Sequence, residues 1–210
     1  MEEFHVSNLP PITPRYNIAP SQDVLAVRET GTGREMVTLR WGLLPSWAKD
    51  GKSTYRMINA RAETVADKPA YRAAFRRRRC LLPADGFYEW QAQADGKQPW
   101  HIRMKDSNVF AFAGLWEHWE GDDQVIESCT IIVTGANEVV RPIHDRMPVI
   151  INRSDYDQWL DPEVQQAEKL APLLRPFASE QMTVYPVSNR VNSPARDDVD
   201  CIKADSGQVG

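Results

Sequence analysis

The sequence predicts an α+β protein in which mainly antiparallel strands curl into a partial barrel with helices around it. Three observations support this fold class. At least five short runs rich in β-branched and aromatic residues occur from residue 23 onward, turn-forming residues separate them, and helical spacing is confined to a few interspersed segments. The length of 210 residues, without a repeat or low-complexity tract, predicts a single domain covering residues 1–210.

The predicted strands begin after an irregular, proline-rich start. Prolines at positions 10, 11, 14 and 20 exclude a continuous helix or a central strand there. A Gly-Thr-Gly loop between "DVLAVRE" and "MVTLRWGLL" predicts one hairpin, and an Asp-Gly pair between "GFYEW" and "WHIRM" predicts a second. "VFAFAGLWEHW" and "ESCTIIVTGA" continue the strand-rich middle, and "MTVYPVS" is expected to form the last strand.

The predicted helices lie between and after these strands. Tyr71 and Phe75 have the spacing of one helical turn, which predicts a helix within residues 68–78. "SDYDQWL" and "PEVQQAEKLAPLL" predict two more, the second with Pro162 at its first position. The polar end of the chain, about residues 197–210, is expected to be a flexible tail.

Composition excludes several classes of protein. The net charge of −4 and the pI near 5.6 mean that nucleic acid would have to bind a local basic patch. No run approaches the ~20 apolar residues of a membrane span, and no secretory signal is visible, so a cytoplasmic protein is expected. The histidines and the three cysteines lack metal-ligand spacing, and no glycine-rich phosphate loop occurs, so neither a metal nor another cofactor is predicted.

Two segments carry polar side chains in patterns that packing alone does not require. In "MINARAE", an extended chain would place Asn59, Arg61 and Glu63 on one face, which fits either a binding surface or an ordinary solvated strand. In "RPIHDRMP", prolines bracket His144 and would hold it in a stiff loop. His144 is then either an acid–base group that works near neutral pH or a loop histidine bound to a backbone carbonyl.

Glu89 stands inside the aromatic run "GFYEW". A carboxylate that is buried without a partner has a raised pKa or costs several kcal/mol, whereas one exposed on a strand costs nothing. Trp47 raises a similar question, because the loop "LPSWAK" either exposes it beside Lys49 as a platform for an unpaired base or folds it over the core. The arginines of "FRRRRC" suit a solvated helix end, although one or two could contact phosphate.

Seven segments occur in a fixed order along the chain. They are "RYNIAPSQ" (15–22), "WGLLPSWAK" (41–49), "INARAET" (58–64), "RCLLPADGFYEW" (79–90), "AFAGLWE" (111–117), "TIIVTGAN" (130–137) and "IHDRMPVII" (143–151). In this order they closely resemble the SRAP family, the SOS-response-associated peptidase-like proteins. The resemblance extends from Arg15 to about Ser188 and implies an SRAP-like fold.

The resemblance implies a protein that recognises abasic sites in single-stranded DNA and acts as a monomer near the bacterial nucleoid. In the family, removal of the initiator methionine exposes a cysteine, whose amine condenses with the sugar aldehyde and whose thiol closes a thiazolidine ring. The resulting covalent link shields the lesion. The older family label implies instead a thiol peptidase that removes its own leading residue.

The same resemblance assigns roles to individual residues. Asn59, Glu89 and His144 would form the active site, with Glu89 and His144 moving protons in a half-dry pocket walled by the neighbouring aromatics. The residues expected to contact DNA are Arg61 and Arg146 at phosphates, Pro20 and Trp47 against bases, and Lys49 beside them.

The sequence departs from the family pattern at its start. Family members begin Met-Cys-Gly-Arg, whereas this sequence begins Met1-Glu2-Glu3-Phe4 and has no cysteine before Cys80. A truncated leader is therefore expected, either from a start codon assigned too far downstream or from a shortened chain; the third alternative is a member that has lost its nucleophile. As printed, the chain is expected to bind single-stranded DNA without the crosslink.

Overall fold

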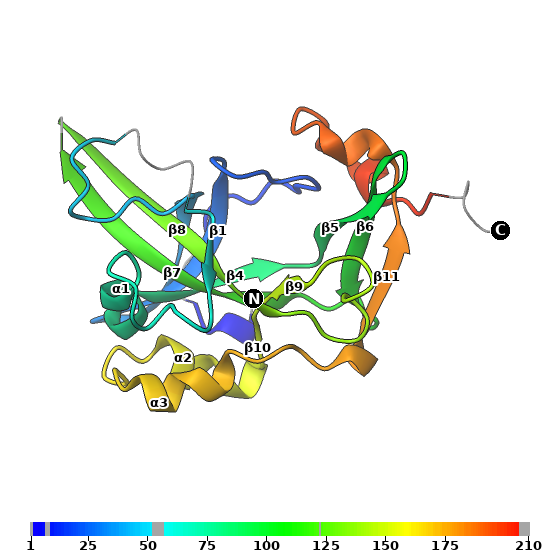
Figure 1. Ribbon diagram of the computed structural model, residues 1–210. Helices are drawn as coiled ribbons and strands as arrows, with labels where there is room; N and C mark the ends of the chain where they lie inside the picture. Colours follow the sequence, from blue (N-terminus) through cyan, green and yellow to red (C-terminus); the bar gives the residue numbers. More distant parts are fainter. Residues whose placement is uncertain (1, 7–8, 52–56, 122, 206–210) are drawn as a thin grey trace.

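The computed structural model describes residues 2–6, 9–51, 57–121 and 123–205, and its centre is a closed five-stranded barrel (Figure 1). The strands pair in the order β7-β4-β1-β2-β8, and a further pairing of β8 with β7 closes the ring. Only the β2–β8 pairing among these five is parallel, so the barrel is mixed. Its strands are β1 (Asp23–Thr30), β2 (Gly33–Trp41), β4 (Arg79–Ala84), β7 (Phe110–Gly121) and β8 (Gln124–Gly135).

Three short strands extend the barrel and a second sheet stands beside it. β3 (Asn59–Arg61) and β9 (Arg146–Pro148) both pair with β8, while β10 (Ile150–Ile151) pairs with β7. The second sheet has the order β11-β6-β5 and contains β5 (Phe87–Gln93), β6 (Gly96–Met104) and β11 (Met182–Pro186). The predicted α+β fold with a strand barrel is confirmed.

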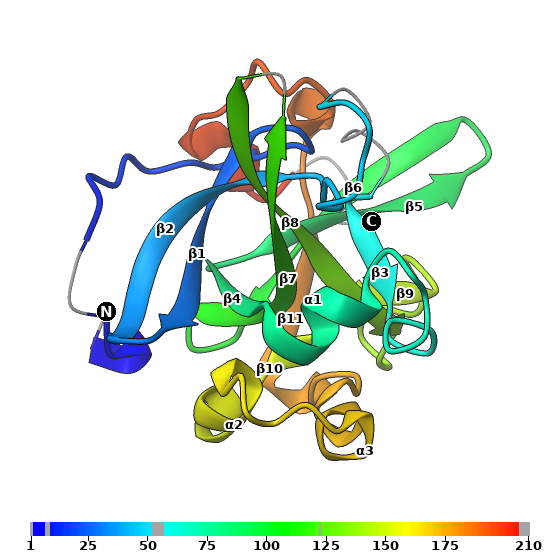
Figure 2. The ribbon, with the colours of Figure 1, turned by 90° about the vertical axis from the view of Figure 1, so that its left-hand side faces the viewer.

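The helices are short and lie on one side of the barrel. Figures 1 and 2 show α2 and α3 beneath it. The α-helices are α1 (Arg72–Arg77), α2 (Tyr156–Leu160) and α3 (Ala167–Leu170). Single 3₁₀ turns cover Glu2–Phe4, Arg153–Asp155, Ala171–Leu173, Ser179–Gln181, Asn189–Asn192 and Val199–Ile202. No helix among the described residues is long and apolar enough to cross a membrane.

The two halves of β7 differ in burial. Its first six residues are all buried, because that half lies between the two main apolar clusters of the protein. The outer half alternates, with Trp119 buried and Glu120 exposed, where the β7–β8 hairpin projects from the barrel (Figure 1). One cluster joins the barrel to the helices through Phe75, Leu115 and Trp159, and the other joins it to the second sheet.

Two predictions at the C-terminal side of the chain are wrong. The helix expected over residues 162–174 is reduced to α3 and one 3₁₀ turn, because the Asp161 carboxylate accepts the N–H of Glu163 and forms a turn where the helix was expected to begin. The flexible tail expected over residues 197–210 is ordered as far as residue 205: Asp197 accepts the N–H groups of Tyr16 and Asn17, and Cys201 is buried. Residues 206–210 lie outside the described chain.

Arg79 is an exception to the solvated arginines expected in "FRRRRC". It is buried, and its guanidinium donates to four backbone carbonyls, at Phe75, Arg76, Trp159 and Asp161. Burial lowers its pKa to about 10. The residue therefore connects the end of α1 to the end of α2 instead of facing solvent.

Candidate functional site

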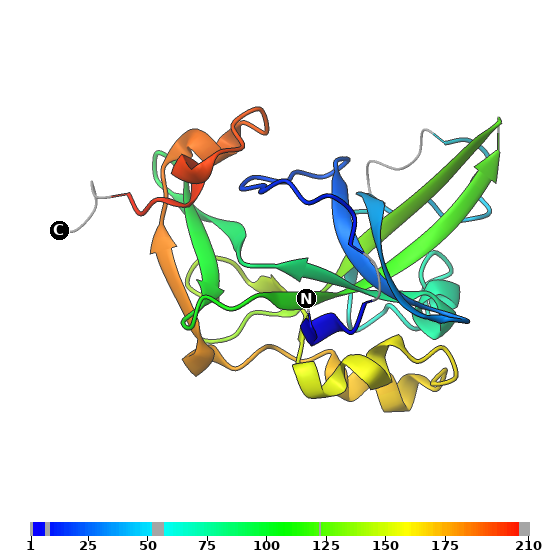
Figure 3. The same cartoon turned by 180° about the vertical axis from the view of Figure 1, so that it is seen from behind.

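A groove of about 1280 Å³ runs between the barrel and the second sheet. The irregular segment of residues 11–20 forms one wall, and Figures 1 and 3 show it crossing the space between the two sheets. The edge strand β5 contributes to the opposite wall. Three of the predicted site residues, Pro20, Asn59 and Glu89, line this groove.

Glu89 lies on the face of β5 that is directed away from its aromatic neighbours in sequence. Side chains alternate along a strand, so Tyr88 and Trp90 point to the opposite face, where they pack in a small cluster with Cys201. Glu89 instead shares its face with Phe87 and with Trp100, its partner across the β5–β6 pair. Tyr88 and Trp90 nevertheless line the same groove as Glu89, so the aromatics expected around the pocket border it from both faces of β5.

The environment of Glu89 still favours the protonated acid. Its side chain is only 22% exposed, and this burial raises the pKa of the carboxyl above its usual range. The charge of a protonated His144 and a hydrogen bond from the Trp90 N–H act in the opposite direction, but burial is the larger effect. Glu89 is therefore a carboxyl group that can exchange a proton nearer to neutral pH than a solvated glutamate can.

His144 approaches Glu89 from a loop that backbone hydrogen bonds hold in place. Its Nδ1 lies 3.9 Å from Oε2 of Glu89. The same nitrogen lies 3.1 Å from the backbone nitrogen and 3.2 Å from the carbonyl oxygen of Arg146, so it accepts from the N–H in one ring tautomer and donates to the carbonyl in the other. Gln91, two residues beyond Glu89 on the same strand face, donates to the carbonyl of Pro142 at 2.9 Å and attaches the loop to β5.

Asn59 and Arg61 lie on one exposed face of β3, as the alternation in "MINARAE" predicts, with Ala60 buried behind them. Glu63 departs from the pattern because β3 ends at Arg61 and the next residues form a turn. Its carboxylate nevertheless accepts a hydrogen bond from Nη1 of Arg146. Arg61 and Arg146 are thereby brought to one surface beside β8, although neither lines the groove.

Trp41 positions the strand that carries Asn59. Its indole N–H donates to the carbonyl of Ile58 at 2.9 Å, and that carbonyl also accepts the N–H of Ile131 on β8. Trp41 itself is half-buried: it packs against the barrel and also lines the groove.

Trp47 and Lys49 are not brought to this groove. Both side chains are exposed, Trp47 to 68%, which favours the exposed alternative over a lid on the core. Their loop contacts the projecting part of the β7–β8 hairpin, where Trp119 donates to the carbonyl of Ala48 and Gly51 lies against Ile126. Asn59 pairs with Ile131, five residues further along β8 and so about 17 Å away. The DNA contacts of Trp47 and Lys49 stay a prediction.

The cysteines of the printed sequence are all buried. Burial raises the thiol pKa of both Cys80 and Cys129, which keeps them protonated and unreactive at neutral pH. Cys201 packs in the cluster behind β5 and β11, with its sulfur 3.4 Å from the carbonyl of Arg196. None of these three thiols lines the groove.

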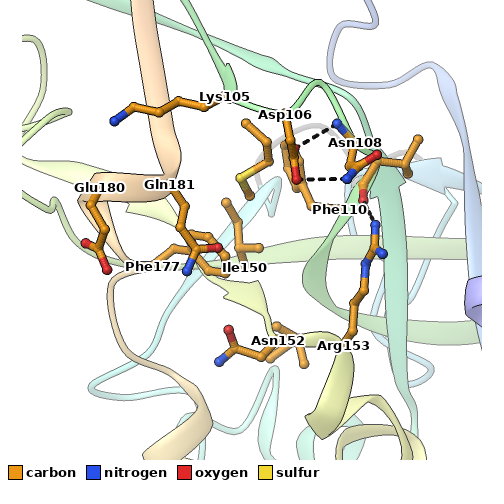
Figure 4. A pocket seen from close by; sticks show the side chains of 13 residues that line it. Lys105, Asp106, Asn108, Phe110, Ile150, Asn152, Arg153, Phe177, Glu180 and Gln181 are labelled. Carbon is orange, nitrogen blue, oxygen red and sulfur yellow. Dashed lines mark hydrogen bonds between the residues drawn. The ribbon is translucent and has the colours of Figure 1, made fainter.

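A second cavity, of about 460 Å³, lies away from these residues (Figure 4). It is formed by the β6–β7 turn, by β10 and by residues 177–181, and no predicted site residue lines it. Some of the polar groups at its rim are paired: Asp106 accepts two hydrogen bonds from Asn108, and Arg153 donates to the carbonyl of Val109. We therefore take the groove as the candidate site.

Comparison with known proteins agrees with the motif order. The family model described as SOS response associated peptidase (SRAP) matches residues 1–194. The chain belongs to the SRAP family. It is 43% identical over 209 residues to the abasic site processing protein YoqW of Bacillus subtilis, which covers 97% of this chain and 93% of the relative. It is 45% identical over 195 residues to YoaM of the same organism, another abasic site processing protein, covering 92% and 86%.

The fold of this SRAP-family chain also matches a solved structure. A crystal structure of a protein from Bacteroides thetaiotaomicron superposes with a TM-score of 0.79 at 28% sequence identity, covering 88% of this chain and 82% of the other. Gln91, which attaches the His144 loop to β5, was not among the residues that the sequence singled out. The period-two spacing from Glu89 to Gln91 was the available signal, because it places both side chains on one strand face.

Proposed function

We propose that this SRAP-family chain recognises abasic sites in single-stranded DNA and that the groove receives the lesion. The observation that carries the proposal is the approach of His144 to Glu89 at the edge of a groove that Asn59 also lines. The two relatives described above, which match over nearly the whole chain, are named abasic site processing proteins. A carboxyl group beside an imidazole suits a sugar whose ring must be opened by proton transfer before it reacts.

Each of the three residues has a distinct part in this proposal. His144, in its doubly protonated imidazolium form, donates a proton to the ring oxygen of the lesion sugar as the ring opens and is left as the neutral imidazole. Glu89, with its raised pKa, accepts and returns the proton of the attacking amine. Asn59 offers an amide that donates and accepts hydrogen bonds to the sugar hydroxyls.

The DNA strand on either side of the lesion is held by charge and by stacking. Arg61 and Arg146 bind the flanking phosphates, for which guanidinium groups are suited. Pro20 lies against a neighbouring base in the groove, and the exposed Trp47 with Lys49 binds the strand further away. A single chain supplies all of these residues, which supports action as a monomer.

The covalent step requires an N-terminal cysteine ahead of the printed residues. Its amine nitrogen attacks the aldehyde carbon of the open sugar, and loss of one water gives an imine. The thiol sulfur then bonds to the same carbon while its proton moves to the nitrogen, which closes the thiazolidine ring without oxidation or reduction. The buried Cys80, Cys129 and Cys201 cannot replace that thiol.

Binding without a crosslink is the second candidate function. It is favoured for the printed chain because the groove, Glu89 and His144 are in place, whereas the three thiols are out of reach. The family description includes a peptidase, but the burial of Cys80 argues against a protease built on that thiol.

The experiment compares the printed chain with a version that carries Cys-Gly-Arg at its N-terminus and with a matched Ser-Gly-Arg version. Each is incubated with single-stranded DNA containing an abasic site, a tetrahydrofuran analogue without an aldehyde, or no lesion. We expect a denaturation-resistant band only for the cysteine version with the true abasic site, and binding of the analogue by all three. A band with the serine version, or no preference for the lesion, would contradict the proposal.

A further inference from the structure

Glu63 and Arg146 form an ion pair across the surface beside the candidate site. Nη1 of Arg146 donates to Oε1 of Glu63 at 2.5 Å. The two side chains are 52% and 32% exposed, so the pair is open to solvent and to a ligand approaching from outside. An exposed pair of this kind is weak enough for another anion to displace one partner.

Backbone pairing with β8 brings Glu63 and Arg146 together. Arg61 pairs with Val133 on β8, and the Ala62 N–H donates to the carbonyl of the same Val133. A hydrogen bond from the Thr64 N–H to the Arg61 carbonyl closes the turn that carries Glu63. Arg146 pairs with Gly135, two residues further along β8, so the two side chains meet across this strand.

Arg61 belongs to the same charge cluster. The pKa of the Glu63 carboxyl lies below its usual range because of a hydrogen bond from its own backbone N–H, the hydrogen bond and charge of Arg146, and the charge of Arg61. One carboxylate therefore faces two guanidinium groups, the two that the proposed function assigns to DNA phosphates.

We propose that Glu63 occupies the position of a DNA phosphate, so that a phosphate of the incoming strand must displace it from Arg146. The inference rests on the proposed function and adds a residue that sets the affinity for the strand. Carboxylate and phosphate oxygens accept hydrogen bonds from a guanidinium in the same way, so one can replace the other. Until DNA arrives, Glu63 keeps Arg146 and Arg61 oriented and partly neutralised.

Replacing Glu63 by glutamine tests this. Glu63→Gln removes the competing charge and keeps the size of the side chain. We expect the affinity for single-stranded DNA to rise about two- to fivefold, the range that the strength of an exposed ion pair implies. In the parent, the displaced Glu63 carboxylate binds a cation from solution and so offsets part of the cation release from the DNA. The glutamine variant has no such carboxylate, so its plot of log affinity against log salt should be steeper by up to about 0.7.

Two controls separate this effect from general charge. Asp157→Asn also removes one acid from an exposed ion pair, with Arg34, and changes the net charge equally. Glu63→Gln in an Arg146→Ala background should lose most of its gain in affinity, because the group that Glu63 restrains is gone. Fluorescence anisotropy of a labelled oligonucleotide measures the affinity of each variant. Thermal unfolding shows that each variant is folded.

The outcomes distinguish this inference from the proposed function. If Arg146→Ala weakens binding but Glu63→Gln matches Asp157→Asn in affinity and salt slope, the role of Glu63 is wrong and DNA binding stands. An equal gain from Glu63→Gln with and without Arg146 also overturns the inference. If Arg146→Ala binds as well as the parent, or the parent does not bind, the proposed phosphate contacts fail and the inference fails with them.

Discussion

The imidazole of His144 lies 3.9 Å from the carboxylate of Glu89, measured from Nδ1 to Oε2. The two residues come from different parts of the protein, one from the edge strand β5 and the other from the loop before β9. The hydrogen bond from Gln91 to the Pro142 carbonyl attaches that loop to the strand. The acid–base pair therefore depends on a contact between two elements that the chain does not join directly.

The first prediction concerns the pH dependence of stability. Burial raises the pKa of Glu89 above 4.5, so the folded protein holds this proton more tightly than the unfolded chain. The resulting stabilisation is present below about pH 4.5 and is lost as pH rises through the raised pKa. Glu89→Gln should therefore raise the melting temperature at pH 8 and give little gain at pH 4.

The exposed Glu120 provides the control for that measurement. Glu120→Gln should leave the difference between the melting temperatures at pH 8 and at pH 4 close to that of the parent. In the leader-bearing protein, Glu89→Gln should also slow crosslinking to abasic DNA. An unchanged rate would remove Glu89 from the mechanism, whatever its effect on stability.

Gln91→Ala tests whether the loop that carries His144 must be attached to β5. We expect slower crosslinking by the leader-bearing protein and a loss of unfolding free energy no larger than about 0.5–1.5 kcal/mol, the contribution of one hydrogen bond. The matched control is Gln93→Ala, on the same strand and exposed. Equal rates for the two variants would show that the Gln91 contact does not position His144.

His101 gives a second pH test, on a group that lines the same groove. Burial lowers its pKa to about 4, from an ordinary value of 6.5. As pH falls, the unfolded chain takes up this proton at a higher pH than the folded protein does. The free energy of unfolding should therefore fall by about 3 kcal/mol between pH 6.5 and pH 4. His101→Asn should flatten the stability profile in this window, and His118→Asn, at an exposed site, should not.

Replacement of Trp47 separates a role in binding from a role in folding. Because Trp47 is 68% exposed, Trp47→Ala should leave the melting temperature within about a degree of the parent. If the indole stacks on a base, the affinity for single-stranded DNA should fall by ~1–3 kcal/mol. Val125→Ala, on the projecting hairpin and 60% exposed, is the control. Unchanged affinity for Trp47→Ala would show that the indole does not stack on a base of the bound strand.

Local signals in the sequence predicted most of the strands. The turn at residues 30–33 and the Asp-Gly pair at residues 95–96 mark the β1–β2 and β5–β6 hairpins, which the structure contains. Closure of the barrel was not predictable in this way, because the parallel contact of Trp41 with Cys129 joins residues far apart in sequence. Hydrophobic alternation records which face of a strand is buried, but not which strand lies beside it.

The same limit applies to side chains whose partners are distant in sequence. Arg79 resembles its solvated neighbours in "FRRRRC", and two of the four carbonyls that permit its burial, those of Trp159 and Asp161, are distant in sequence. Asp197 resembles part of a polar tail until the N–H groups of Tyr16 and Asn17 are seen beside it. Alternation correctly placed Asn59 and Arg61 on one face, and it failed at Glu63 because β3 ends first.

A crystal structure of the protein with a short single-stranded oligonucleotide containing a tetrahydrofuran lesion would test the central claim most directly. The account predicts the lesion sugar in the groove, within hydrogen-bonding distance of Asn59, Glu89 and His144, with a flanking phosphate on Arg146 in place of Glu63. An oligonucleotide bound elsewhere, or a sugar that touches none of those three side chains, would contradict it.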